Sequence, residues 1–562
     1  MARKIIGLSC FYHDSAVAAI EGGAIRFAIQ EERLSRVKHD SRFPIMAIAK
    51  TLEVCKWSVN EIDTIVFYEN PVLKLNRLYN QVISDWPRSW KLFSEHVPQF
   101  YAYKYPIEQI IRDKLRYNGT VRCAQHHLSH AASAFYTSPF ESALVLTIDG
   151  VGEYDTTALF SGEGNIIKPI RSIHFPDSLG LLYSVFTQYL GFEVNEGEYK
   201  VMGLAPYGKP RFTDRILGRM IKLNGDGSFE VNTRYFDFSN RDRHYRDAFA
   251  DEIGVPPRTS KDPMLKDHED LAASIQQVLE MAVINILKVA LDEFPNKNVC
   301  MAGGVALNCT ANSRIAREFG VKMFIQPAAG DAGGALGAAL LEAIKDVGDS
   351  SYRFPFTPYL GVDYRNAIEV TLRLNGLHVN RVENIEAEIA KQLAKQNVVA
   401  ILSGRDEWGP RALGDRSILA DPRDPKMKDH LNAKIKFREE FRPFAPVVME
   451  EYYAEYFETL GMDNSPYMLF THRALRPEQI PAVVHVDGTS RAQTVSEAQN
   501  PYMYAILSEF KRLTGVPVLI NTSFNLKGEP IVSGPSDALK TFFASGIDSL
   551  ALEDYLVEKS PR

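Results

Sequence analysis

Two histidines one helical turn apart are the strongest chemical signal in this sequence. In the run HHLSHAASAF, His126 and His130 stand at positions i and i+4. A helix would bring both imidazoles to one face, where they could bind one metal ion. His127 could pair with His130 at i+3 instead, and the sequence leaves this choice open. The alternative interpretation is a pair of core or capping histidines with no metal.

Two aspartates at the ends of predicted elements could complete a metal site. Asp149 ends the apolar run LVLTID, and Asp331 begins the helix-like run DAGGALGAAL. A carboxylate at the end of a buried strand is costly unless a cation or hydrogen-bond donors stabilise it. Two imidazoles and two carboxylates suit Fe(II), Zn or Mn, with positions open for phosphate or carbonyl oxygens. The sequence does not choose among these metals.

A repeated β-meander is expected to position these residues. Segments 4–32 and 143–172 each show the pattern strand, turn, strand, turn, strand. In each segment, an Asp follows the first turn (Asp14 and Asp155), with a Gly nine residues later and an Ile eleven residues later. The repetition predicts an internal duplication of one α/β unit, the alternative being two unrelated hairpins.

Glycine-containing turns follow two later strands. Segments 298–320 and 321–344 each contain an apolar strand, a Gly-rich turn and a helix, after a long amphipathic helix at 270–294. Such turns at helix N-termini are where α/β folds bind nucleotide phosphates, because bare amides and the helix dipole meet there. The sequence therefore predicts nucleotide binding at these turns.

The chain divides into two predicted domains. The stretch 345–365 is punctuated by Gly, Pro and Ser and lacks periodicity. We place a metal- and nucleotide-binding domain at 1–348, a linker at 349–365 and a second α/β domain at 366–562. An inserted helical segment, 71–118, carries aromatic residues that we expect mostly to fill a core: Trp86, Trp90, Phe93, Phe100, Tyr101 and Tyr103.

Composition restricts the class of protein. The 562 residues are 45% hydrophobic and carry 64 Lys and Arg against 70 Asp and Glu. This is typical of a globular chain that is not built around nucleic acid or anionic lipid. Five scattered cysteines without a C-x-x-C pair predict reduced thiols in the cytoplasm. No signal peptide or membrane span is expected, because no run of about 18 apolar residues occurs.

The ordered motifs resemble a known family. FYHDSA, EERLSRVKH, EGEYKVMGLAPYG, AGGVALN and AAGDAGGALGAAL are followed by GRDEWGPRALGDRSI, KFREEFRPFAP, RAQTV and NTSFN. Over essentially the whole chain, this set resembles the O-carbamoyltransferases that modify antibiotics, nodulation factors and related natural products. The resemblance implies an N-terminal domain like that of the threonylcarbamoyl-transfer enzymes, with the duplicated actin/sugar-kinase/Hsp70 (ribonuclease-H-like) fold. It also implies a C-terminal α/β domain similar to YrdC-like enzymes.

The resemblance implies a reaction in two steps. The C-terminal domain would convert carbamoyl phosphate and ATP, with Mg²⁺, to carbamoyl-AMP. The N-terminal domain would hold one divalent metal, Fe(II) before Zn or Mn, and transfer the carbamoyl group to a hydroxyl of a small-molecule natural product. An adenylate leaving group and a Lewis acid are both useful, because the carbamate nitrogen makes the carbonyl a poor electrophile. No nucleic-acid or membrane partner is implied, and a homodimer is left open.

Site residues follow from the motifs that carry the resemblance. His13 would be the general base for the acceptor hydroxyl, with Asp14 as its rival, and Lys38 would neutralise a phosphate or carbamoyl oxygen. Gly303, Gly304 and Asn308 would cradle the adenosine. The phosphate and adenylate contacts of the second domain would be Arg411, Lys436, Arg491, Asn521 and Ser523. Arg416, Arg438 and Arg442 are secondary candidates for the same contacts.

Three other functions are alternatives to carbamoyl transfer. A kinase or other phosphotransferase of the actin-like superfamily would leave the histidine pair and the second domain without a role. A tRNA threonylcarbamoyl-type modification enzyme would need a basic or aromatic strand-binding surface that the sequence does not show. A non-catalytic ATP-dependent regulator would not need His13 and Lys38. The acceptor molecule cannot be predicted from the sequence.

Overall fold

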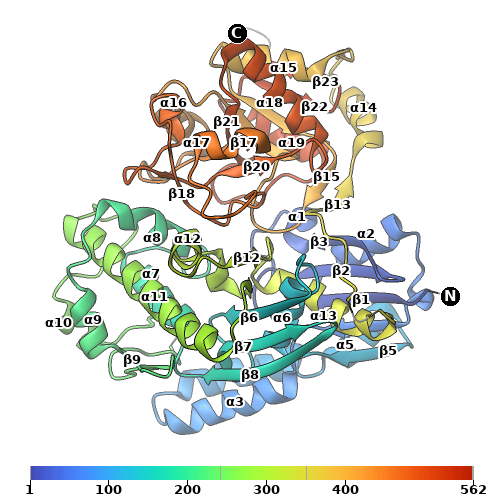
Figure 1. The fold of residues 1–562 in the computed structure, drawn as a ribbon. Coiled ribbons are helices and arrows are strands. Elements are labelled where there is room, and N and C mark those ends of the chain that lie inside the picture. The colour runs from blue at the N-terminus through green and yellow to red at the C-terminus, as the bar shows by residue number, and fades with distance from the viewer. Residues whose placement is uncertain (1, 241, 350, 560–562) are drawn as a thin grey trace. The chain divides into compact units, whose positions relative to one another are not determined.

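The computed structural model describes residues 2–240, 242–349 and 351–559, which fall into two compact units (Figure 1). The first unit contains the described residues up to Arg26 together with Ser41–Phe356. The second contains Phe27–Asp40 and the described residues from Thr357 onwards. Both units combine helices with β-sheets, so the predicted α/β class is confirmed.

Two five-stranded sheets with the same topology belong to the first unit, except that residues 27–30 of one edge strand fall in the second. The order in one sheet is β3 (Ala24–Gln30), β2 (Ala16–Glu21), β1 (Lys4–Ser9), β4 (Thr64–Phe67), β5 (Thr120–Cys123). The order in the other is β8 (Ile166–His174), β7 (Asp155–Glu163), β6 (Ser142–Ile148), β11 (Asn298–Ala302), β12 (Lys322–Ile325). In each, three consecutive strands lie side by side, and two further strands run parallel to the first of them. The predicted internal duplication of one α/β unit is confirmed.

Helices α6 (His126–Phe135) and α13 (Asp331–Ala343) approach each other closely. A Cβ at Gly337 of α13 would lie 1.7 Å from the Ser129 carbonyl oxygen of α6. A Cβ at Gly7 of β1 would lie 1.9 Å from the Ala335 carbonyl oxygen of α13. Since neither contact leaves room for a side chain, glycine sets how close the two helices and β1 can come. This packing brings the N-terminal residue of α13 beside α6.

The segment 71–118 is helical, as predicted. Its elements are α3 (Pro71–Ser84), η2 (Leu92–His96), α4 (Val97–Gln99), η3 (Phe100–Lys104) and α5 (Ile107–Leu115). The expectation that its aromatic residues mostly fill a core was wrong, because five of the six are at least 40% exposed: Trp86, Trp90, Phe93, Tyr101 and Tyr103. Smaller aliphatic side chains form the core cluster of this segment instead: Leu78, Val82, Leu92 and Val97.

Further helices of the first unit are α7 (Leu179–Tyr189), α8 (Glu198–Leu204), α9 (Thr213–Arg219), α10 (Asp247–Ile253), α11 (Lys266–Glu293) and α12 (Cys309–Phe319). The long helix α11 packs against α7, α8, α9 and α12. Within the described residues, α11 is the one helix long and apolar enough to cross a membrane by length and composition. Since 61% of its most apolar window is buried inside the structure, core packing accounts for much of that apolar surface.

A seven-stranded sheet forms the centre of the second unit. Its order is β20 (Gln493–Val495), β17 (Ala445–Met449), β21 (Val518–Ser523), β16 (Arg416–Ala420), β14 (Val399–Leu402), β22 (Ser549–Leu552), β23 (Tyr555–Glu558). Helices α14 (Arg365–Leu374), α15 (Ile385–Ala394), α18 (Pro501–Thr514) and α19 (Pro535–Phe543) contribute to the same core. Strand β13 (Tyr359–Asp363) pairs with β15 (Arg405–Glu407). Regular structure therefore begins inside the segment 349–365 that we expected to be a linker.

The segment Phe27–Asp40 is attached to the second unit by arginine side chains. Arg33 Nη2 donates to the Gly409 carbonyl at 2.9 Å, within a segment that contains the short helix α1 (Glu31–Ser35). Arg36 donates to the carbonyls of Pro530 and Ile531. The segment EERLSRVKH thus belongs structurally with residues several hundred positions later in the chain.

Candidate active site

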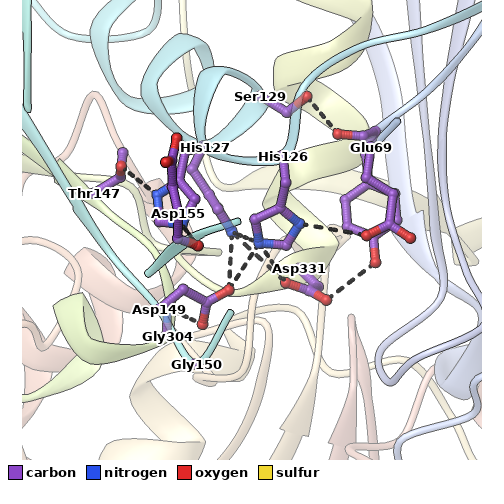
Figure 2. A network of polar contacts seen from close by, with 12 residues as sticks. Glu69, His126, His127, Ser129, Thr147, Asp149, Gly150, Asp155, Gly304 and Asp331 are labelled. Carbon is purple, nitrogen blue, oxygen red and sulfur yellow. Dashed lines mark hydrogen bonds and ion pairs between the residues drawn. The ribbon is translucent and has the colours of Figure 1, made fainter. Parts of the chain in front are cut away.

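Four predicted metal ligands lie together in the first unit (Figure 2). His126, His130, Asp149 and Asp331 each offer one ligand atom, and these atoms lie within 4.8 Å of one another. His126 Nε2 is 3.1 Å from His130 Nε2 and 2.9 Å from Asp149 Oδ2. Asp331 Oδ1 is 3.7 Å from His126 Nε2 and 3.6 Å from His130 Nε2. One helix, the residue after β6 and the first residue of α13 thus converge on one point.

His127 faces away from this group. Its Nδ1 lies 2.7 Å from Thr147 Oγ1, and its Nε2 lies 2.9 Å from the Asp155 carbonyl oxygen. Both ring nitrogens therefore have protein partners on the neighbouring strands. Of the two pairings that the sequence left open, the structure brings His126, and not His127, to His130.

The donor set fits a divalent metal ion. The two imidazole Nε2 atoms face each other and the carboxylates, whereas both Nδ1 atoms are buried with no hydrogen-bond partner among the described residues. Burial acts to raise the pKa of Asp149, but hydrogen bonds with His126 and His130 outweigh it and lower this pKa well below its usual range. Ionised carboxylate oxygens and imidazole nitrogens are the donors that such metals take in proteins.

His13 lies in the turn between β1 and β2. Its Nδ1 is 2.9 Å from Asp14 Oδ2, and the side chain is partly exposed. Burial acts to lower the pKa of His13, but the charge of Asp331 and the hydrogen bond with Asp14 outweigh it and raise this pKa to about 9. A cation held by Asp331 and Asp149 would oppose this shift, because it would offset the negative charge that causes it.

The glycine turn after β11 contacts Asp149, one of the four predicted metal ligands. Gly303 has φ +89° and ψ 158°, a backbone conformation essentially restricted to glycine. The Gly304 N–H donates to Asp149 Oδ1 at 3.2 Å. The turn that we predicted to cradle adenosine therefore also orients one of the predicted metal ligands.

We expect Gly303→Ala to destabilise the first unit by about 3 kcal/mol, at the upper end for a strained backbone position. The new Cβ would lie 2.2 Å from the Ile148 carbonyl oxygen, so β6 would also have to move. Gly320→Ala is the matched control, because Gly320 has φ +60° and a Cβ added there would meet no heavy atom within 4 Å. That change should cost about 1 kcal/mol. Equal urea-unfolding midpoints for the two variants would contradict this account.

Asn308 is the N-cap residue of α12, at the helix start where the sequence placed it. Its Oδ1 accepts from the Ala311 N–H at 3.0 Å, and its side chain exchanges two hydrogen bonds with Gln276 of α11. The amide group is therefore occupied by protein partners, which the sequence did not reveal.

In the second unit, three predicted contacts lie at or beside β21. Lys436 Nζ donates to the Ser523 carbonyl at 2.7 Å and to Asn525 Oδ1 at 2.9 Å. Asn521 donates to Gln493 Oε1 of β20 at 2.7 Å. Lys436, Asn521 and Ser523 thus lie on neighbouring elements of one sheet region.

The predicted cationic groups of the second unit differ in their surroundings. Arg491 and Arg411 are half-buried, and Arg491 Nε is enclosed without a hydrogen-bond partner among the described residues. Burial, together with the positive charges of Arg438, Arg442 and Lys38, holds the pKa of Lys436 well below its usual range. The structure therefore places Lys38 in the electrostatic environment of Lys436, in the second unit, whereas His13 belongs to the first.

Arg416, a secondary candidate, is committed to the core of the second unit. It is completely buried, and its Nε lies 2.8 Å from Asp406 Oδ1. Its guanidinium also donates to the carbonyls of Ser533 and Ser403. These contacts explain a buried arginine without a phosphate ligand.

Both parts of the chain match family models. The model described as the carbamoyltransferase N-terminus matches residues 4–340, and the carbamoyltransferase C-terminus matches residues 390–559. The chain belongs to the carbamoyltransferase family. The resemblance on which we based the site residues is thereby confirmed at the level of the family.

Relatives of this carbamoyltransferase-family chain match along most of their length. It is 43% identical to an uncharacterized protein of Synechocystis sp., covering 99% of this chain and 97% of that protein. It is 37% identical to nodulation protein NolNO of Sinorhizobium fredii, covering 98% of this chain and 79% of that protein. Nodulation protein U of the same organism is 31% identical, with 92% of each chain covered.

Solved structures are only weakly similar to this family member. Component A of (R)-2-hydroxyglutaryl-CoA dehydratase from Acidaminococcus fermentans gives a TM-score of 0.35 at 15% identity, covering 61% of this chain and 98% of that one. HypF of T. kodakarensis gives a TM-score of 0.34 at 13% identity, covering 62% of this chain and 49% of that one. Neither similarity is strong enough to bear on the activity.

Sequence reasoning missed several buried charged residues of this family member. Arg33 is 1% exposed, and its Nε and Nη1 have no hydrogen-bond partner in the part of the chain that is described. Its partner Gly409 lies 376 residues away, so no local pattern could have assigned it. Glu69, buried beside His126, was also missed, because its contact with that histidine joins two separate elements of the chain.

Proposed function

We propose that this chain is an ATP-dependent O-carbamoyltransferase with a small-molecule natural product as its acceptor. Carbamoyl phosphate and ATP would be converted to carbamoyl-AMP in the second unit, and the carbamoyl group would pass to a hydroxyl in the first. The observation that carries this proposal is the convergence of His126, His130, Asp149 and Asp331 in a chain of the carbamoyltransferase family. A phosphotransferase of the actin-like superfamily would not require this nitrogen and oxygen donor set.

Cationic side chains of the second unit are suited to polyphosphate chemistry. Water would hydrolyse carbamoyl phosphate to carbamate and phosphate, and a carbamate oxygen would then attack the α-phosphorus of Mg²⁺–ATP, forming carbamoyl-AMP and releasing pyrophosphate. Arg411, Arg491 and Lys436 are assigned to the phosphate oxygens, because guanidinium groups bind them in a bidentate manner and an ammonium acts as a point charge. Lys436 Nζ lies beside β21, where it donates to the carbonyls of Ser523 and Asn525, so a phosphate oxygen would have to replace one of these acceptors.

In the first unit, His126, His130, Asp149 and Asp331 would hold Fe(II), with Zn or Mn as the alternatives. A divalent metal bound there would supply Lewis acidity for the carbamoyl carbonyl group. His13 Nε2 would accept the proton of the acceptor hydroxyl, while Nδ1 keeps its hydrogen bond with Asp14 and so holds the ring in place. AMP is the leaving group.

A cytoplasmic location follows from the proposed substrates, because ATP and carbamoyl phosphate are cytoplasmic metabolites. Among the described residues none of the five cysteines forms a disulfide, which agrees with a reducing compartment.

The direct test of the first step is incubation of the protein with ATP, Mg²⁺ and carbamoyl phosphate. We expect carbamoyl-AMP in the mass spectrum and pyrophosphate release that depends on carbamoyl phosphate. Formation of ADP would instead identify a phosphotransferase. Pyrophosphate release without carbamoyl phosphate would also contradict the proposal.

His13→Asn should separate the two steps. We expect carbamoyl transfer to fall by roughly 10²- to 10⁴-fold, the usual contribution of a general base, while pyrophosphate release is unchanged. Transfer is measured with ¹⁴C-labelled carbamoyl phosphate and a panel of aminoglycoside and lipo-chitooligosaccharide acceptors. His174→Asn is the control, because the His174 side chain is 61% exposed on β8 of the same unit. Transfer by His13→Asn at the wild-type rate would remove His13 from the mechanism.

A further inference from the structure

Glu69 lies directly behind one of the metal-ligating histidines. It follows strand β4, and its Oε2 is 3.8 Å from His126 Nδ1 (Figure 2). This nitrogen is on the opposite side of the ring from Nε2, which faces Asp149 and His130. Since His126 Nδ1 has no hydrogen-bond partner among the described residues, Glu69 is placed as an acceptor for its proton.

Two lysines hold Glu69 as a buried anion. The Glu69 side chain is fully buried, with Lys74 Nζ 2.6 Å from Oε2 and Lys104 Nζ paired with Oε1. Both lysines come from the segment 71–118, for which the sequence offered no function. Two ammonium groups therefore hold this buried carboxylate in place from both of its oxygens.

Tyr68, the residue before Glu69, makes a comparable contact with a second ligand. Its hydroxyl donates to Asp331 Oδ2 at 3.3 Å, while Asp331 Oδ1 faces the two imidazoles. Burial raises the pKa of Tyr68 well above its usual range, so the hydroxyl stays a donor. Tyr68 and Glu69, which follow β4, thus contact Asp331 and His126 at atoms other than those that face the other predicted ligands.

The contact with a ligand imidazole distinguishes this arrangement from an ordinary buried ion pair. Buried ion pairs are often no better for stability than apolar packing. Here two ammonium groups converge on one carboxylate that faces a ligand imidazole. In metal sites, a carboxylate at the second ring nitrogen fixes the tautomer and orientation of the histidine and makes the ligating nitrogen a stronger donor.

We propose that Glu69 is a positioning residue that orients the His126 imidazole for metal binding. Lys74 and Lys104 hold the Glu69 carboxylate in place, so the segment 71–118 would contribute to metal affinity without contacting the metal. The inference rests on the metal site of the proposed function and adds residues that neither the motifs nor the family match assigned.

The test is the metal affinity of full-length Glu69→Gln after removal of bound metal with a chelator. We expect Co²⁺ and Zn²⁺ to bind 10- to 100-fold more weakly than to the wild type in chelator competition, the usual effect of losing such a partner. The visible absorption of bound Co²⁺ should also change, because the orientation of one ligand changes. Both measurements are independent of catalytic activity.

Glu153→Gln is the matched control. Glu153 is 7% exposed and accepts hydrogen bonds from the backbone N–H groups of Asn70 and His126, at 2.6 Å and 3.0 Å. Glu153 is therefore, like Glu69, a buried glutamate next to His126. It contacts the backbone N–H of His126, whereas Glu69 contacts the imidazole ring. Metal affinity and the Co²⁺ spectrum of this variant should match those of the wild type.

Glu69→Asp keeps the test decisive if Glu69→Gln does not fold. The shorter side chain retains the charge for Lys74 and Lys104 but reaches less far towards His126. We expect weakened metal binding at an unchanged melting temperature of the metal-free protein. If the wild type binds metal and the Glu69 variants bind it equally well, the inference is overturned and the metal site stands. If the wild type binds neither Co²⁺ nor Zn²⁺, the metal site itself fails, and the inference with it.

Discussion

His130→Ala is expected to abolish metal binding by the first unit. His130 is completely buried, and its Nε2 lies among His126, Asp149 and Asp331, at 3.1 to 3.6 Å from their facing atoms. Alanine leaves three donors and an apolar gap that no nearby side chain fills in the same geometry. Affinity should fall by more than about 100-fold, since losing a ligand costs more than losing an outer partner. The loss of affinity is measured as the metal content of the protein after dialysis against Fe(II), Zn²⁺ or Mn²⁺.

The control for this experiment is His127→Ala. His127 lies on the same helix, three residues before His130, but it bonds Thr147 and the Asp155 carbonyl. Its removal should lower the melting temperature, because buried hydrogen-bonding groups lose their partner, yet leave the metal stoichiometry unchanged. Carbamoyl transfer should be lost in His130→Ala and retained in His127→Ala. Metal retained by His130→Ala and lost by His127→Ala would reverse the ligand assignment.

The helical period was sufficient to predict that two histidines of this motif share a face, but not which two. The i, i+3 and i, i+4 spacings are both compatible with one face of a helix. The choice depends on β6 and β7, which offer hydrogen-bonding partners to both ring nitrogens of His127. Those strands are distant in the sequence from any local signal in the motif. Asp149 and Asp331 were accessible because each stands at the end of a strongly patterned element.

Residues that act through long-range contacts were not accessible. Glu69 has no distinctive spacing to Lys104, and the pairing arises only when the irregular helical segment folds back on the end of β4. The sequence also shows EERLSRVKH beside the first meander, where Lys38 was predicted to neutralise a phosphate or carbamoyl oxygen. Contacts such as that between Arg33 and Gly409 place this segment in the second unit. Local propensity cannot encode a partner hundreds of residues away.

The second large effect is expected for Arg491→Ala in the formation of carbamoyl-AMP. Arg491 precedes β20, whose Gln493 bonds Asn521 of β21, the strand that also positions Lys436. Its Nε is enclosed and has no hydrogen-bond partner within the described part of the chain, so it has an N–H available for a ligand oxygen. Removing a guanidinium that grips phosphate should reduce pyrophosphate release by about 100-fold, since charge-assisted bidentate contacts are among the strongest hydrogen bonds. Arg491→Lys keeps the positive charge but cannot make the bidentate guanidinium contact. Its rate of pyrophosphate release should therefore lie between those of the wild type and Arg491→Ala.

Arg512→Ala is the matched control for Arg491→Ala. Arg512 is 61% exposed on α18 of the same unit and pairs with Glu509, so its loss should leave pyrophosphate release unchanged. His13→Asn should also release pyrophosphate normally, because its defect lies in the later transfer. A proposal of two separate steps requires this contrast: Arg491→Ala must stop both steps, and His13→Asn only the second. Pyrophosphate release by Arg491→Ala at the wild-type rate would mean that the phosphate groups bind elsewhere in the second unit.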